Sequence, residues 1–280
     1  MCAAVSDPLR EFADVVGEAG QAIELLPAAF AVARMAYPDL DPAPYVIQLQ
    51  EWGAELQRRI ADLAYPLPRV RALRTLLFEE LGFTGNRESY YDDRNSFLND
   101  VIERRTGIPI SLSVVTLAVA TFAGMPVRGV GFPGHFLVRY MGDEDSYILF
   151  DPFGGGEILI EADCMTRLRA IYGPDAVFEP RMVEPVTSRQ LITRMLANLK
   201  GVYLQQKEYG SALAVVDRLM LIEPNRSIEH RDRGMLLLSL QRYQSAISSL
   251  RHYLDVETDA QDAGVIRRLI GEIQTRYDVD

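Results

Sequence analysis

The sequence predicts an α+β fold followed by an all-α repeat domain. An uncharged apolar helix at about residues 111–122 precedes four short β-like runs, as expected for a buried helix packed on an antiparallel sheet. Helical periodicity dominates the first third of the 280 residues. The last third repeats with a period of 34 residues, which is typical of stacked helical hairpins.

Three helices are expected in the first third of the chain, over residues 25–35, 44–60 and 70–81. Pro38 stops the first helix, because the residue before a proline is kept away from helical backbone angles. Pro44 opens the second helix, and Gly82 ends the third. Residues 83–95 are polar and predict a loop.

The middle of the chain predicts a short helix over 96–105, with Gly107 as its C-terminal cap, and then the apolar helix. Polar residues 142–146 predict a hairpin turn between the second and third β-like runs. The four runs are 127–130, 136–140, 147–150 and 157–160.

The C-terminal repeat is visible without gaps. Residues 209–223 match residues 243–257, with Tyr, Ser, Ala, Leu and Glu recurring in register. This period predicts tetratricopeptide repeats, which would be closed by a capping helix over 262–277. Residues 179–185 read as a linker, so the predicted domains are 1–185 and 186–280.

Composition narrows the function classes. There is no apolar run long enough to span a membrane, and no basic-then-apolar leader, so a cytoplasmic protein is expected. The two cysteines, Cys2 and Cys164, are too few for a disulfide framework or a cysteine-rich zinc site, and no cofactor or metal is predicted. All of the net negative charge lies in the first 185 residues, since residues 186–280 hold 13 Lys+Arg against 12 Asp+Glu, and this disfavours nucleic acid as a partner of the first domain.

Three residues have the chain order of a nucleophile–His–Asp site. Ser111 opens the apolar helix, His135 precedes a β-like run, and Asp151 ends another. His135 could act as a general base and Asp151 could hold its ring in one tautomer. Each has a plainer reading: Ser111 as a helix cap, His135 as a strand histidine and Asp151 as a turn residue.

Four more residues are candidates for lining the same site: Asn95, Asn99, Pro109 and Ser113. The asparagines could supply polar contacts, although turn and cap roles explain them equally well. Ser113 lies in the first turn of the apolar helix, where backbone N–H groups could stabilise an oxyanion.

The order of these motifs resembles that of the transglutaminase-like, papain-related superfamily. The matching segments are Gly107-Ile-Pro109, Ala123-Gly-Met-Pro-Val-Arg128, His135 and Asp151-Pro152. Over nearly the whole chain, the sequence resembles the bacterial SirB-type family, in which such a core precedes tetratricopeptide repeats. The resemblance implies an antiparallel core sheet and roles for His135 and Asp151.

The superfamily cysteine has no counterpart here. It falls on Pro109 when the motifs are aligned without gaps, and on Ser111 after a slip of two positions. The sequence is compatible with two functions. One is a non-catalytic regulatory protein that binds a protein or peptide in the groove of its repeats. The other is a serine-dependent hydrolase or acyltransferase acting on an amide or ester through Ser111, His135 and Asp151.

Overall fold

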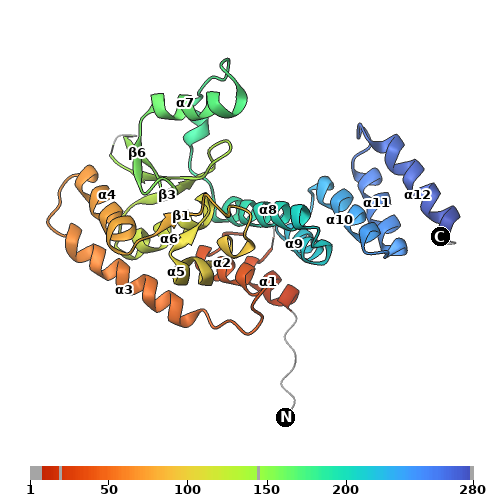
Figure 1. Cartoon of the computed structure of the whole chain (residues 1–280), viewed down its shortest axis with the longest axis horizontal. Coiled ribbons are helices and arrows are strands. Elements are labelled where there is room, and N and C mark those ends of the chain that lie inside the picture. The colour runs from red at the N-terminus through yellow and green to blue at the C-terminus, as the bar shows by residue number, and fades with distance from the viewer. Residues whose placement is uncertain (1–7, 19–20, 144–145, 278–280) are drawn as a thin grey trace, which may run out of the picture. The chain divides into compact units, whose positions relative to one another are not determined.

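The computed structural model describes residues 8–18, 21–143 and 146–277 and confirms the predicted fold class (Figure 1). Packing divides the described residues into two compact units. One unit contains residues 22–195; the other contains helix α1 (Pro8–Val16) and the chain from Leu196 onward. The domain boundary that the sequence predicts after residue 185 concerns sequence families and not packing, and it stays a prediction.

The first unit begins with helical segments. Their bounds differ from the predicted ones mainly at the third helix, which starts at Pro66 and finishes as a π-helical turn. The elements are α2 (Leu25–Ala33), α3 (Ala43–Ile60), α4 (Pro66–Arg74), η1 (Thr75–Glu80), β1 (Thr84–Gly85), η2 (Asp93–Asn95), α5 (Leu98–Arg104), β2 (Thr106–Gly107) and α6 (Pro109–Phe122).

Helix α6 is the centre of this unit. It starts at Pro109, two residues before the predicted start, because proline suits the first helical position. It packs on α3 on one side and on the sheet on the other (Figure 1). Gly53 permits the approach of α3, since a Cβ there would stand 2.3 Å from the Cβ of Phe122. The absence of charge in α6 therefore reflects contacts on both of its faces.

The sheet is an antiparallel meander in the order β3–β4–β5–β6. Its strands are β3 (Val127–Val130), β4 (Leu137–Met141), β5 (Tyr147–Asp151) and β6 (Glu157–Leu159), each within one residue of the predicted runs at either end. Val138 of β4 lies opposite Phe150 of β5. This register brings the start of β4 next to the end of β5, and the candidate histidine and aspartate are found at these two strand ends.

Helix α7 (Glu161–Tyr172) was not predicted, and it contributes to an apolar cluster on the sheet. Only Cys164 and Leu168 of this helix are buried, whereas Ile171 and Tyr172 are exposed, so its apolar residues do not mark one buried face. Both pack with Val130 and Leu149 of the sheet.

The segment expected to be a linker is structured. It forms a short 3-10 helix, η3 (Pro180–Val183), and then runs along the edge of β3. Pro185 bridges Val130, and the Val186 N–H donates to the Gly129 carbonyl at 2.9 Å. This segment therefore covers part of the exposed edge of the sheet.

The sequence predicts Gly107 as the cap of the helix before it, but the structure places another residue there. Arg105 caps α5 in the left-handed region, with φ of 55°. Its guanidinium lies over the ring of Trp52 at 4.2 Å and that of Phe83 at 4.9 Å, and these cation–π contacts offset the unfavourable backbone. Gly107 instead pairs in parallel with Gly85 in the two-stranded sheet β1–β2.

The repeats follow the predicted period. Helices α9 (Tyr209–Ile222) and α11 (Tyr243–Val256) begin 34 residues apart. The residues with positive φ before them, Lys207 and Gln241, have the same spacing. The remaining helices are α8 (Ser188–Gln206), α10 (Ser227–Ser239) and α12 (Ala263–Tyr277), and α12 covers an apolar cluster of α11 as the predicted capping helix would.

Candidate functional site

His135 and Asp151 meet at one end of the sheet. His135 lies in the turn between β3 and β4, where its N–H donates to the Phe132 carbonyl at 3.0 Å. Asp151 is the last residue of β5. Its side chain shares a sheet face with Leu149, two residues earlier, because side chains alternate along a strand. That face is the one covered by α7, from which Arg167 reaches the carboxylate.

The Asp151 carboxylate is buried and accepts three hydrogen bonds. His135 Nε2 lies 2.8 Å from Oδ1, the Phe153 N–H donates to Oδ1 at 2.9 Å, and Arg167 Nη1 donates to Oδ2 at 2.6 Å. Burial would raise the pKa of Asp151, but the bonds and charges of His135 and Arg167 outweigh it and lower the pKa below its ordinary value. The group is thus held as a carboxylate. Arg167 was missed in the sequence because α7 was not predicted.

The Ser111 hydroxyl is engaged at the start of α6. It accepts from the Ile108 N–H at 3.1 Å and donates to the Asn95 carbonyl at 2.6 Å. The side chain is fully buried, and a Cβ at Gly107 would lie 2.7 Å from its oxygen. Among the described residues, no hydrogen bond joins Ser111 to His135. The structure therefore brings His135 and Asp151 together and engages Ser111 with other groups.

The four residues considered as lining lie in the interior. Asn95 is fully buried, and its amide donates to the carbonyls at positions 89 and 90, which fixes the loop before it. Asn99 and Ser113 are also buried, and the Ser113 hydroxyl donates to the Pro109 carbonyl at 2.7 Å. Pro109 is the first residue of α6 and is buried as well. These side chains build the scaffold beneath the site.

The two cysteines are the other side chains that could act as a nucleophile. Cys164 is a free thiol in the core, and burial raises its pKa, so it does not have the exposed thiolate of a reactive cysteine. Cys2 lies outside the described residues. Within the described parts of the chain, no group of three or more His, Cys, Asp or Glu side chains is placed to hold a metal ion.

The surroundings of His135 are aromatic and cationic. The Phe153 ring meets the His135 ring edge-on with centroids 5.9 Å apart, and Tyr90 meets Phe153 edge-on at 6.3 Å. Arg194 Nη2 donates to the His135 carbonyl at 2.6 Å. Neither Arg194 nor Phe153 was singled out in the sequence, since nothing local in it connects them to the histidine.

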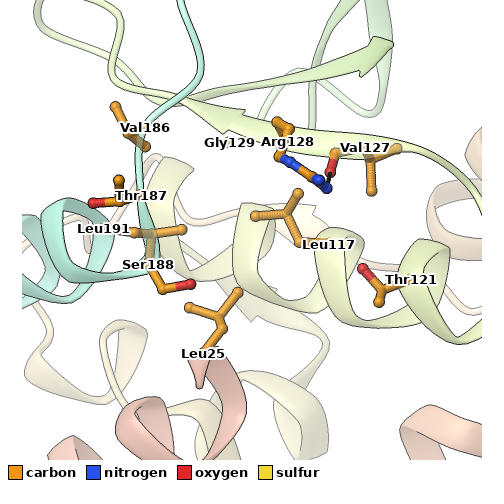
Figure 2. Close-up of a pocket in the computed structure, with 10 residues that line it drawn as sticks. All are labelled: Leu25, Leu117, Thr121, Val127, Arg128, Gly129, Val186, Thr187, Ser188 and Leu191. Carbon is orange, nitrogen blue, oxygen red and sulfur yellow. Dashed lines mark hydrogen bonds between the residues drawn. The ribbon is translucent and has the colours of Figure 1, made fainter. Parts of the chain in front are cut away.

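A separate cavity of about 270 Å³ lies between α6, β3 and the start of α8. Figure 2 shows Leu117 and Thr121 projecting from α6 towards β3 and the start of α8. None of its lining residues belongs to the His135–Asp151 pair: they are Leu25, Leu117, Thr121, Val127, Arg128, Gly129, Val186, Thr187, Ser188 and Leu191.

Comparison with known families agrees with this geometry. Residues 43–197 match the model of the transglutaminase-like superfamily. The chain belongs to that superfamily. Residues 199–271 match a tetratricopeptide repeat model, so a transglutaminase-like region is followed by repeats in one chain.

The chain also belongs to the UPF0162 proteins. It is 36% identical over 251 residues to the UPF0162 protein of Xylella fastidiosa strain Temecula1, covering 88% of this chain and 89% of that protein. It is 32% identical over 234 residues to the UPF0162 protein of Vibrio cholerae, covering 84% and 86%. F-box only protein 21 of Homo sapiens is 34% identical over 157 residues, which are 52% of this chain and 22% of that protein.

No helix in the described ranges combines the length and the apolar character needed to cross a membrane.

Proposed function

We propose that this protein acts by binding other proteins, and that its transglutaminase-like region is non-catalytic. The observation that carries the proposal is the state of the two positions that could hold the nucleophile. Pro109 has no nucleophilic atom, and the hydroxyl of Ser111 is buried and bonded to Asn95 and Ile108. With neither residue available to it, the His135–Asp151 pair has no partner with which to attack a carbonyl carbon.

The repeats supply the second part of the proposal, because tetratricopeptide repeats generally mediate contacts between proteins. Helices α8 and α10 each expose one large apolar side chain, Leu204 and Met235, and α12 exposes two, Val265 and Tyr277. We expect a protein or peptide to bind over them, in the groove of the repeats. A regulatory role in the cytoplasm fits such binding.

A hydrolase or acyltransferase remains the second candidate, because the bond of 2.8 Å between His135 and Asp151 is the geometry that a general base requires. Asp151 binds Nε2, which leaves Nδ1 as the nitrogen that would face a nucleophile. For this candidate to hold, a nucleophile would have to reach Nδ1 in the working protein.

The deciding experiment is a hydrolysis assay on a panel of chromogenic esters and amides. It compares the wild type with Ser111→Ala and with His135→Ala. We expect the three proteins to give the same background rate. A rate in the wild type that both substitutions abolish would refute the proposal and establish the serine mechanism.

Binding through the repeats is tested by a matched pair of substitutions. Met235→Glu places a charge on α10, whereas Val256→Glu places one at the end of α11, where the side chain is also exposed. A partner isolated with the wild-type chain should be lost with Met235→Glu and retained with Val256→Glu. Equal retention by both variants would exclude binding over the apolar residue of α10.

A further inference from the structure

Arg194 is a partly buried cation beside His135 that lacks an acidic partner. Its Nη2 donates to the carbonyls of Phe132 and His135, at 3.0 and 2.6 Å. No carboxylate among the described residues lies within 4.0 Å of its guanidinium. The other two nitrogens, Nε and Nη1, make no hydrogen bond within the described part of the chain and are not among the buried unpartnered atoms, so they reach solvent.

The charge of Arg194 is only partly compensated. Burial lowers its pKa, and the neighbouring titratable groups are the phenols of Tyr90 and Tyr172 rather than carboxylates. A neutral phenol or a backbone carbonyl can accept a hydrogen bond but cannot neutralise the charge. Charges removed from water are normally paired, so an anion would gain a strong contact at the free nitrogens.

A second arginine, Arg87, contacts the Phe153 ring, which also contacts His135. The Arg87 guanidinium stands over Phe153, 4.9 Å from the ring centroid, and the same ring meets His135 and Tyr90. Arg87 is exposed, and it too has no carboxylate within 4.0 Å among the residues that the structure describes. Two cations without acidic partners thus border one aromatic cluster.

We infer that this surface, made by Arg87, Tyr90, Phe153, His135 and Arg194, binds an acidic segment of a partner protein through its Asp or Glu carboxylates. The exposed guanidinium of Arg87 can match a carboxylate in two parallel hydrogen bonds, and Arg194 can donate a single bond to a carboxylate from Nε or from Nη1. Exposed arginine and tyrosine side chains are also the types that dominate binding energy at protein interfaces. The inference rests on the proposed binding function and adds a second contact surface, in the transglutaminase-like unit.

The net charge of the chain makes the inference specific. At −10 the protein as a whole repels an acidic peptide, so attraction must come from a local cationic surface. The test uses a fluorescein-labelled peptide of repeating Glu-Ala-Tyr units and its Gln-Ala-Tyr counterpart, with affinity for the full chain measured by fluorescence anisotropy. We expect the Glu peptide to bind at least about tenfold more tightly than the Gln peptide.

Substitutions locate the site. Arg87→Gln should weaken the Glu peptide by about threefold or more, since exposed pairs are weak, and Arg194→Gln by about tenfold or more. Arg71→Gln is the matched control, because Arg71 is an exposed arginine of the same unit that forms no ion pair among the described residues. It should leave the affinity unchanged. Arg194 donates to the carbonyls of the turn that contains His135, so Arg194→Gln can disturb that turn. Arg87 makes no such bond to the backbone of the described ranges, and Arg87→Gln therefore tests the surface independently.

Equal affinity for the two peptides, or equal weakening by Arg87→Gln and Arg71→Gln, overturns the inference. Those results leave the proposed function intact, provided that the hydrolysis assay is silent and Met235→Glu still abolishes partner capture. Hydrolysis that depends on Ser111 and His135 would instead refute the proposed function whatever the peptides do.

Discussion

Replacement of Asp151 by asparagine tests the energetics of the candidate site most directly. The carboxylate is 2% exposed and accepts from three donors, of which Arg167 is charged. A charge-assisted hydrogen bond contributes about 1.5–3 kcal/mol. Asparagine keeps an acceptor for the Phe153 N–H but turns an amide N–H towards Arg167 or His135. We therefore expect Asp151→Asn to lower the free energy of unfolding by about 2–4 kcal/mol.

The chain offers a local probe for this measurement. Trp52 is its single tryptophan, and it lies in α3 within the same compact unit as Asp151. Tryptophan fluorescence during urea unfolding therefore reports the transglutaminase-like unit and not the repeats. The circular dichroism of the same samples follows both units, so a change confined to fluorescence locates the effect.

The pH dependence gives an independent check. The pKa of Asp151 is lowered in the folded state, so as the pH falls the unfolded chain takes up this proton first. The stabilisation by Asp151 is complete above the ordinary aspartate pKa of about 3.9 and is lost as the pH falls through the lower folded value. The difference between wild type and Asp151→Asn should be full at neutral pH and shrink below about pH 4.

A double-mutant cycle with Arg167→Met separates the ion pair from the other contacts. Arg167 is partly exposed, so Arg167→Met should lower the free energy of unfolding by less than Asp151→Asn does. The two substitutions should be coupled by about 1 kcal/mol. Two results would refute this account of the site. One is a change of less than about 0.5 kcal/mol in Asp151→Asn. The other is strict additivity of the two substitutions.

Three further predictions concern single features. Ser111→Ala should destabilise the first unit by about 1–2 kcal/mol in the same fluorescence assay, because it removes a buried helix cap. Lys200→Met should destabilise the repeats by about 3 kcal/mol in circular dichroism, since Lys200 Nζ lies 2.8 Å from the carboxylate of Glu229, which is 1% exposed; the double variant with Glu229→Met should recover part of the loss. The repeats should also lose stability as the pH falls below about 6.5, because burial and the neighbouring His252 lower the pKa of His230, and His230→Gln should flatten that dependence in thermal melts.

Much of the fold could be predicted because its signals are local. An uncharged apolar stretch, four alternating runs and a fixed period each act within a few tens of residues. Helix α7 was not predicted because its apolar residues are divided between a buried face, with Cys164 and Leu168, and exposed positions such as Ile171 and Tyr172. The cap at Arg105 was not predicted because glycine is the ordinary choice for a left-handed residue. The rings that make arginine acceptable there, Trp52 and Phe83, are distant from it in the sequence.

The candidate site divides in the same way. His135 and Asp151 stand at strand ends that an antiparallel meander brings together, so their proximity follows from the order of the elements. The state of Ser111 depends on a carbonyl of Asn95, which no local pattern reveals. Arg167 and Arg194 come from helices far along the chain, and only the tertiary structure shows that they meet the pair.

A bonded histidine and aspartate are not by themselves evidence of catalysis in this fold. Through its three hydrogen bonds, Asp151 connects the end of β5 to the turn before β4 and to helix α7. This structural role requires no nucleophile. On the proposed function, the pair would serve stability and not catalysis. What separates a binding protein from an enzyme here is whether a nucleophile reaches Nδ1 of His135, and the first turn of α6 offers only a proline and a serine whose hydroxyl is already bonded.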